Sequence, residues 1–439
     1  MSWSDKSRRK RRVALTVLAS CLLVLCLIGV SGLSVHLHGE EQAKEVENSR
    51  VSPELNIQEG VRNQIAETEQ KTDTQGEIRY TEDGEESVVQ RVEKLMAQMT
   101  AEQKVAQLFF VLPDSLAQVG SVTQVGDLTS AAYREYPVGG IVYMEGNILS
   151  EKQMIAMNAS FTSLSREVLG VEPFLSGEEE GGTVVRIAGN PAFSVENVGS
   201  MDEIGRTQDT TQAYQAGRTL GGYLSRFGFN MDFAPVADIL VNPANTVVRE
   251  RSFGSDPEMV AEMVAAQVKG FKESGVEPVL KHFPGHGATA EDSHQGYAYA
   301  DRDMEELRQT ELVPFQEGIQ AGADFVMVGH ICFPQIAGGD VPASLSHWAV
   351  TQLLKEELSF EGVAVTDAMN MGAIANHYSS AEAAVKAVQA GVDMVLMPAD
   401  FQSAYNGVME AVEGGEISQE RLEDAVRRIL TVKVRTQGS

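Results

Sequence analysis

Cysteine is scarce in this 439-residue sequence, which contains only three. Cys21 and Cys26 fall in an apolar run near the N-terminus, so Cys332 is the only cysteine in the rest of the chain. A single cysteine cannot form an internal disulfide, which excludes a disulfide-stapled fold for that part. The hydrophobic content of 43% and charged content of 22% instead indicate an ordinary globular protein with a sizeable core.

Positive charge is also in short supply, with 35 Lys and Arg against 62 Asp and Glu and a formal net charge of -27. Such a chain repels a phosphate backbone, so we expect no nucleic acid partner. Basic residues gather only in KSRRKRR (6–12), directly before an uncharged apolar run at 13–35. That run has about 23 residues, and about 20 suffice to cross a bilayer.

This polarity predicts a cytoplasmic basic segment at 1–12 and a transmembrane signal-anchor at 13–35, with the remaining chain outside the cytoplasm at the cell membrane. LASC (18–21) resembles a lipoprotein cleavage box, so a lipoprotein or a secreted form is the alternative. Residues 36–87 are polar and acidic without an apolar period, which indicates a flexible linker. We place the folded domain at 88–439.

Eight apolar segments with the character of buried strands alternate with helical segments along this domain. Such an alternation predicts a (β/α)8 TIM-type barrel of parallel strands. An open doubly wound sheet is the alternative, although no glycine-rich dinucleotide fingerprint follows the early strands. The strand candidates are 105–111, 138–144, 173–178, 229–239, 278–283, 324–331, 362–369 and 392–398.

Ionisable residues follow several of these strands, and the carboxyl ends of barrel strands share one rim. Asp232 and Asp238 are expected to bond neighbouring loop amides rather than to react. Asp367 ends an apolar strand, where an unpaired acid is costly to bury, so it is a candidate nucleophile or a cap of the next helix. The other members of the rim set are Glu178 to Glu180, Lys281, His282, His286 and His330.

The densest stretch is KHFPGHGATAEDSH (281–294). His282 and His286 have the spacing of a helical zinc motif, but Phe-Pro-Gly breaks the helix and no further ligand set is recognisable. We therefore expect neither a metal nor a cofactor. Asp292 and His294 are one residue apart, so a carboxylate can orient an imidazole for proton transfer. A solvated surface turn is the alternative for this pair.

Five motifs occur in a fixed order along the folded domain: FAPVAD (233–238), RERSFGSDPEMV (249–260), KHFPGHG (281–287), DSH (292–294) and TDAMNMGAI (366–374). Together they resemble glycoside hydrolase family 3, in its β-N-acetylglucosaminidase (β-hexosaminidase) branch. The likeness extends from about Met99 to Arg435 and implies the single-domain form, in which the barrel carries both catalytic groups.

This resemblance implies a catalytic trio and a set of sugar contacts. Asp367 matches the nucleophile, His294 the general acid/base and Asp292 the partner of that histidine. Residues matching the sugar contacts are Lys281, His282, Arg251 and Glu178. The usual Asp-x-Glu-Gly-Gly-Arg is EEEGGT here, so Glu178 replaces an aspartate and Thr183 an arginine.

The expected function is retaining exo-hydrolysis of terminal β-linked GlcNAc from glycans, with peptidoglycan fragments as substrate because the anchor keeps the enzyme near the wall. The alternatives are a β-N-acetylglucosaminide phosphorylase and a catalytically silent glycan-binding barrel. No oligomeric state and no role for His286 beyond the loop structure are predicted.

Overall fold

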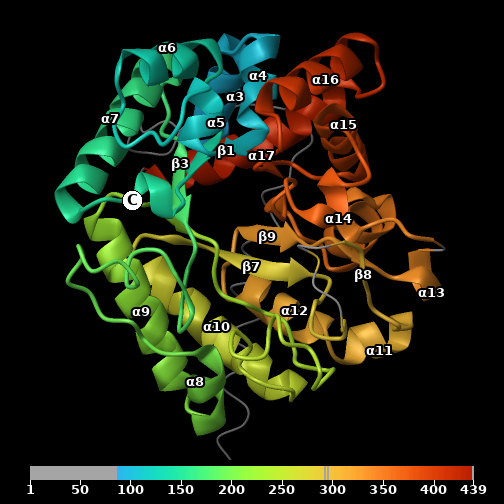
Figure 1. Ribbon diagram of the computed structural model, residues 1–439. Coiled ribbons are helices and arrows are strands. Elements are labelled where there is room, and N and C mark those ends of the chain that lie inside the picture. The colour runs from blue at the N-terminus through green and yellow to red at the C-terminus, as the bar shows by residue number, and fades with distance from the viewer. Residues whose placement is uncertain (1–86, 291–292, 294–295, 338, 438–439) are drawn as a thin grey trace, which may run out of the picture. The chain divides into compact units, whose positions relative to one another are not determined.

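The computed structural model describes residues 87–437, except 291–292, 294–295 and 338 (Figure 1). The predicted basic segment (1–12), the predicted membrane segment (13–35) and all of the predicted linker except Ser87 lie outside the described residues. Within the described part, no helix is both long and apolar enough to cross a membrane.

Eight parallel strands form one sheet and follow one another in the order of the chain. The first strand pairs with the last, and a bridge between Val365 and Met394 links the last two strands, so the sheet nearly closes into a barrel. A strand forms in each of the eight predicted segments, and the doubly wound alternative is wrong. The first segment (105–111) was predicted too long, because residues 105–107 belong to helix α4 (Ala101–Gln107), which begins at the capping box of Thr100 and Gln103. The strands are β1 (Phe109–Val111), β2 (Gly140–Val142), β3 (Phe174–Gly177), β6 (Met231–Asp232), β7 (Glu277–Phe283), β9 (Phe325–Val328), β11 (Val363–Thr366) and β12 (Val395–Leu396).

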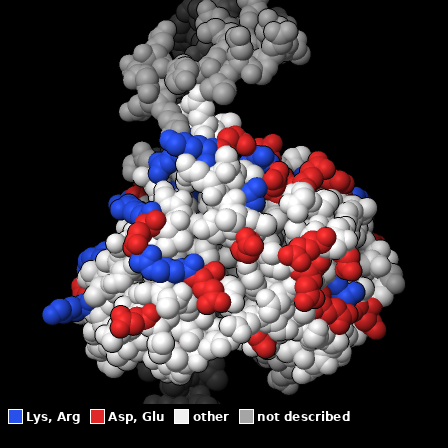
Figure 2. Space-filling model, turned by 90° about the horizontal axis from the view of Figure 1, so that it is seen from above, with Lys and Arg blue, Asp and Glu red and all other residues white. Residues whose placement is uncertain are grey.

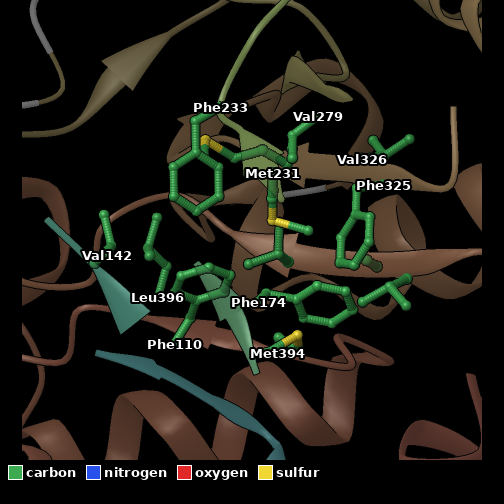
Figure 3. Close-up of a cluster of buried hydrophobic side chains, with 14 of the residues drawn as sticks. Phe110, Val142, Phe174, Met231, Phe233, Val279, Phe325, Val326, Met394 and Leu396 are labelled. Carbon is green, nitrogen blue, oxygen red and sulfur yellow. The ribbon is translucent and has the colours of Figure 1, made fainter. Parts of the chain in front are cut away.

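The barrel interior is filled by large apolar side chains contributed by most of the strands. Figure 3 shows Phe110 of β1, Phe174 of β3, Met231 of β6 and Phe325 of β9 converging on one another. The rings of Phe174 and Phe325 meet edge to face with centroids 5.0 Å apart. Because the strands are buried on both faces, their sequences are continuously apolar, which is why they could be found in the sequence.

Helices surround the strands and cover the outer face of the sheet (Figure 1). Neighbouring helices pack along the chain order, for example α9 on α10 and α10 on α12. The longer helices are α3 (Val88–Gln98), α6 (Asp127–Glu135), α7 (Glu151–Leu169), α9 (Thr210–Arg226), α10 (Pro257–Glu273), α12 (Leu312–Gln320), the π-helix η4 (Trp348–Glu357), α15 (Ser380–Ala390), α16 (Phe401–Glu413) and α17 (Gln419–Gln437).

Short elements lie between the barrel units. Two-stranded pairs are formed by β4 (Glu179–Gly181) with β5 (Val184–Val185) and by β8 (Ala298–Tyr299) with β10 (Ile331–Cys332). The short helices are α4 (Ala101–Gln107), α5 (Pro113–Ala117), η2 (Glu145–Asn147), α8 (Met201–Thr207), α11 (Met304–Gln309), α13 (Pro334–Ala337), η3 (Ala343–Leu345) and α14 (Gly372–Ala375).

A lysine is buried near the start of the barrel strands. Lys433 of α17 is fully buried, with Nζ 2.8 Å from Gln107 Oε1 and 5.1 Å from the centroid of the Phe174 ring. Burial lowers the pKa of Lys433 to about 7, against the opposing effect of Glu172. The unfolded chain, in which a lysine has a pKa of about 10.4, therefore binds more protons than the folded chain between about pH 7 and pH 10.

Wild-type stability should thus gain up to about 1.4 kcal/mol per pH unit from this lysine as the pH rises through that window. In Lys433→Met this contribution is absent. Urea denaturation of both proteins between pH 7 and pH 10 should show that the free energy of unfolding of the wild type increases relative to that of the variant as the pH rises. A pH-independent difference between the two would contradict a neutral buried lysine.

Candidate active site

Residues that the sequence places at the strand ends meet at one rim of the barrel. Glu178 follows β3, Lys281 and His282 lie in the last part of β7, and Asp367 follows β11 directly. Arg251 reaches the same cluster from the connection between β6 and α10. The structure therefore brings together five of the seven predicted site residues, while Asp292 and His294 lie outside the described residues.

Lys281 and Arg251 converge on one buried carboxylate. Lys281 is fully buried, with Nζ 2.6 Å from Glu180 Oε1. Arg251 donates from Nε and Nη2 to the two oxygens of Glu180, each at 2.7 Å. Burial raises the pKa of Glu180, but Arg251 and Lys281 outweigh it and hold that pKa well below its usual range. Glu180 is thus an ionised hub that fixes two cations at the rim.

His282 is oriented by a second buried acid. Its Nδ1 lies 2.7 Å from Asp238 Oδ2, and its Nε2 faces Arg251 Nη2 at 3.4 Å. The carboxylate of Asp238 can only accept, so Nδ1 of His282 carries a proton. Asp238 also accepts from the backbone N–H groups of His282 and His286, which confirms its predicted role toward loop amides. Asp232 also has the predicted role, because its Oδ1 accepts a hydrogen bond from the backbone N–H of Glu179 at 3.0 Å.

Asp367 is half-buried, and its Oδ1 accepts a hydrogen bond from the N–H of Ala368 at 2.7 Å. Burial raises the pKa of Asp367, but the nearby His282 and His330 reverse the effect and leave it below its usual value. The carboxylate is therefore ionised at neutral pH. The helix-cap alternative is wrong, because the next helix, α14, has Met371 at its N-cap and no side-chain cap.

Glu178 has a partner that the sequence reading missed. Arg186 Nη2 donates to Glu178 Oε2 at 2.6 Å, and Lys281 Nζ lies 3.6 Å from Glu178 Oε1. Burial raises the pKa of Glu178, yet Lys281 and Arg186 together lower it below its usual value. Thr183, where the family motif has an arginine, is exposed at the turn between β4 and β5. Arg186, three residues later, thus supplies a guanidinium to this acid.

The backbone around Arg186 is fixed by Glu179. This buried carboxylate accepts from the N–H groups of Arg186, Ile187 and Ala188 at 2.7 to 2.8 Å, and from the Tyr223 hydroxyl at 2.7 Å. Each of the three consecutive glutamates therefore has a separate task. Only the first, Glu178, keeps substantial solvent exposure, which suits it to meet a ligand.

Arg186→Met should lower kcat/KM about tenfold, mainly through KM, because it removes a charge-assisted hydrogen bond from a partly exposed acid. Thr183→Ala is the matched control and should retain wild-type kinetics. Steady-state kinetics of both variants on a chromogenic substrate would measure this. Equal effects of the two substitutions would contradict the assignment of Arg186 as the partner of Glu178.

His286 lies behind the site. It is buried, with Nδ1 3.0 Å from Thr289 Oγ1 and Nε2 3.2 Å from Ser293 Oγ. Burial and the neighbouring His282 lower the pKa of His286, so it is neutral at pH 7. Among the described residues, no group of three or more His, Cys, Asp or Glu side chains is arranged to hold a metal ion.

Comparison with known proteins identifies the family. The model of the glycosyl hydrolase family 3 N-terminal domain matches residues 100–432. The chain belongs to glycosyl hydrolase family 3. This confirms the resemblance drawn from the sequence motifs and agrees with the parallel barrel.

Relatives within family 3 carry hexosaminidase names. β-Hexosaminidase A of Pseudoalteromonas piscicida is 33% identical over 325 residues, which cover 69% of this chain and 54% of that protein. β-Hexosaminidase LpqI of Mycobacterium tuberculosis (strain ATCC 25618 / H37Rv) is 32% identical over 334 residues, covering 73% of this chain and 82% of that protein. The chain thus matches little more than half of the first relative and most of the second.

A similar solved structure is the family 3 β-N-acetylglucosaminidase from Paenibacillus sp. str. FPU-7, with a TM-score of 0.72 and 35% identity. The matched region covers 78% of this chain and 64% of the Paenibacillus chain. The β-glucoside phosphorylase BglX has a TM-score of 0.70 at 23% identity, which is a likeness of fold alone.

Proposed function

We propose that this chain is a retaining exo-β-N-acetylglucosaminidase that removes terminal β-linked GlcNAc from glycans. The observation that carries the proposal is Asp367, an ionised carboxylate at the barrel rim beside His282 and His330. A carboxylate in this setting can act as a nucleophile toward a glycosidic carbon. The hexosaminidase names of the relatives support an acetamido sugar as the substrate.

In the proposed first step, an oxygen of Asp367 attacks the anomeric carbon and the bond to the aglycone oxygen breaks. His294, oriented by Asp292, donates a proton to the leaving oxygen. In the second step His294 takes a proton from water, whose oxygen attacks the same carbon and releases Asp367. Two displacements leave the anomeric configuration unchanged.

Sugar binding is assigned to the paired charges of the rim. Glu178 is ionised and accepts hydrogen bonds from sugar hydroxyls, since its carboxylate has lone pairs beyond those used by Arg186. Lys281, His282 and Arg251 complete the set. All four side chains are already fixed by protein partners, which limits the entropy lost when the sugar binds.

We further propose that residues 13–35 attach the enzyme to the membrane with the barrel outside the cytoplasm. Peptidoglycan fragments, which occur close to the membrane there, are the proposed substrate. The basic flank at 6–12 and the uncharged run after it support this topology. Figure 2 shows one face of the described part, on which the largest group of charged side chains, on the right of the view, is mostly acidic. This acidic group agrees in sign with the formal net charge of -27.

Kinetics of the full-length protein on aryl β-GlcNAc and aryl β-glucoside, with and without phosphate, test the proposal. We expect faster turnover of the GlcNAc substrate, free GlcNAc as the product and no dependence on phosphate. Formation of GlcNAc 1-phosphate would replace the hydrolase with a phosphorylase. Sugar binding without turnover would indicate a glycan-binding barrel. Product analysis on defined muropeptides and chito-oligosaccharides then identifies the preferred aglycone.

A further inference from the structure

Two rim connections, the one after β7 and the one after β11, are joined at Ser293. Ser293 is the single described residue between 291 and 295, and it is buried. Its Oγ lies 3.2 Å from His286 Nε2, and its carbonyl oxygen accepts from the N–H of Ala373 at 3.2 Å. Ala373 belongs to α14, which follows Asp367 in the chain.

A second contact joins the same two connections. The Tyr297 ring stacks on His377 with centroids 4.1 Å apart and an interplanar angle of 10°. Burial and a hydrogen bond with Tyr378 raise the pKa of Tyr297, so its hydroxyl stays protonated. Directly after Tyr297, the chain pairs with β10 through β8. The connection after β7 is therefore fixed on the far side of Ser293 as well.

The inner end of this connection is anchored to the sugar-binding cluster. The N–H of His286 donates to Asp238 Oδ1 at 2.6 Å, and the other oxygen of Asp238 holds His282. Gly287 packs so closely on Ile239 that an added Cβ would lie 1.7 Å from the Ile239 carbonyl oxygen. A continuous series of contacts thus runs from His282 through Asp238 and His286 to Ser293.

We propose that Ser293 is a positioning residue for the proton-transfer step, with the Tyr297–His377 stack as its second support. The inference rests on the proposed function, because Ser293 stands in sequence between the proposed pair Asp292 and His294. Two hydrogen bonds tie Ser293 to the connection that carries Asp367 and to His286. Ser293 acts through His294 and does not touch the substrate.

The readout that isolates proton transfer is the dependence of rate on the leaving group. A 2,4-dinitrophenyl aglycone departs without a proton, whereas a poor leaving group such as 4-methylphenol needs the acid. Ser293→Ala and Tyr297→Leu should lower kcat/KM on the poor leaving group by about tenfold to a hundredfold. The loss on 2,4-dinitrophenyl GlcNAc should be far smaller. Azide, which attacks without a base, should raise kcat on that substrate in both variants.

Matched variants separate this role from general destabilisation. Ser165→Ala removes another buried serine hydroxyl, one that bonds Tyr133 and the Val171 carbonyl far along the chain from the rim. It should show the wild-type leaving-group dependence, and thermal melting of all variants checks their folding. Equal losses on both aglycones in Ser293→Ala, or no loss on either, would overturn the inference.

His294→Ala separates failure of the inference from failure of the proposed function. It should show the same leaving-group pattern with larger losses, about 10²- to 10⁴-fold on the poor leaving group. If His294→Ala shows that pattern and Ser293→Ala behaves like the wild type, the inference fails and the function stands. If His294→Ala retains full activity on every aglycone, the proposed function fails and the inference with it.

Discussion

Asp367→Ala is expected to lower kcat on aryl β-GlcNAc by about 10⁴-fold or more, because it removes the carboxylate proposed to form the covalent intermediate. The side chain is already ionised and oriented, since Ala368 donates to it and the nearby His282 and His330 favour its charged form. The variant removes both the proposed nucleophile and the negative charge that would stabilise a positive transition state. Steady-state and burst kinetics measure the loss.

Rescue by azide determines the role of Asp367 as well as its importance. In Asp367→Ala, azide can enter the space of the carboxylate and displace an activated aglycone, which gives the α-glycosyl azide. In His294→Ala it attacks the glycosyl-enzyme from the opposite face and gives the β-azide. Asp400→Ala, which removes the exposed N-cap of α16, is the control and should keep wild-type kcat. A β-azide from Asp367→Ala would contradict its role as nucleophile.

The barrel could be predicted from the sequence because its strands are buried on both faces. A segment such as EPVLKHF in β7 is buried at every position, so its apolar character stands out even with Lys281 and His282 included. The regular return of a helix after each strand then limits the topology to a closed parallel sheet. Residues 1–86 depend on composition alone, and the predicted anchor and linker stay predictions.

The strand pattern predicts a site residue only where that residue lies in the last part of a strand or directly after it. Lys281, His282, Glu178 and Asp367 fall in this class, whereas Arg251 was predicted from the family resemblance alone. Arg186 could not be predicted as a site residue. It reaches Glu178 through an irregular turn whose backbone is held by Glu179, and across such a turn no helical or strand period relates Arg186 to Glu178. A faint signal existed, since the arginine missing at Thr183 reappears three residues later.

The sequence also could not predict which basic group each acid of the rim contacts. The sequence placed Glu178, Glu179 and Glu180 together at the rim, and the structure gives each of them a different set of partners. Asp238 was expected to bond loop amides, and it does, but it also orients the ring of His282. Such contacts join residues more than 40 positions apart, and neither the composition nor the hydrophobic period of a single sequence encodes them.

Lys281→Met is expected to cost both activity and stability, and the two losses should be separable. Lys281 is buried against Glu180, so its removal leaves that carboxylate with Arg251 alone. Breaking a buried pair on one side costs about 3–5 kcal/mol. The free energy of unfolding should fall by this order, and kcat/KM should fall about 10²- to 10³-fold as the hydroxyl contact and the fixed rim are lost.

The double variant Lys281→Met/Glu180→Gln isolates the electrostatic part, because it also removes the carboxylate left behind. Denaturation at pH 7 should show partial recovery of stability, whereas activity should stay low, since the rim then lacks its ionised hub. The pH dependence has a definite sign. The depressed pKa of Glu180 gives the wild type stability above the unfolded pKa of about 4.3 that is lost as the pH falls. The gap between wild type and Lys281→Met should therefore narrow below about pH 4.5. A constant gap from pH 7 to pH 3 would mean that lost packing, rather than the unpaired charge, destabilises the variant.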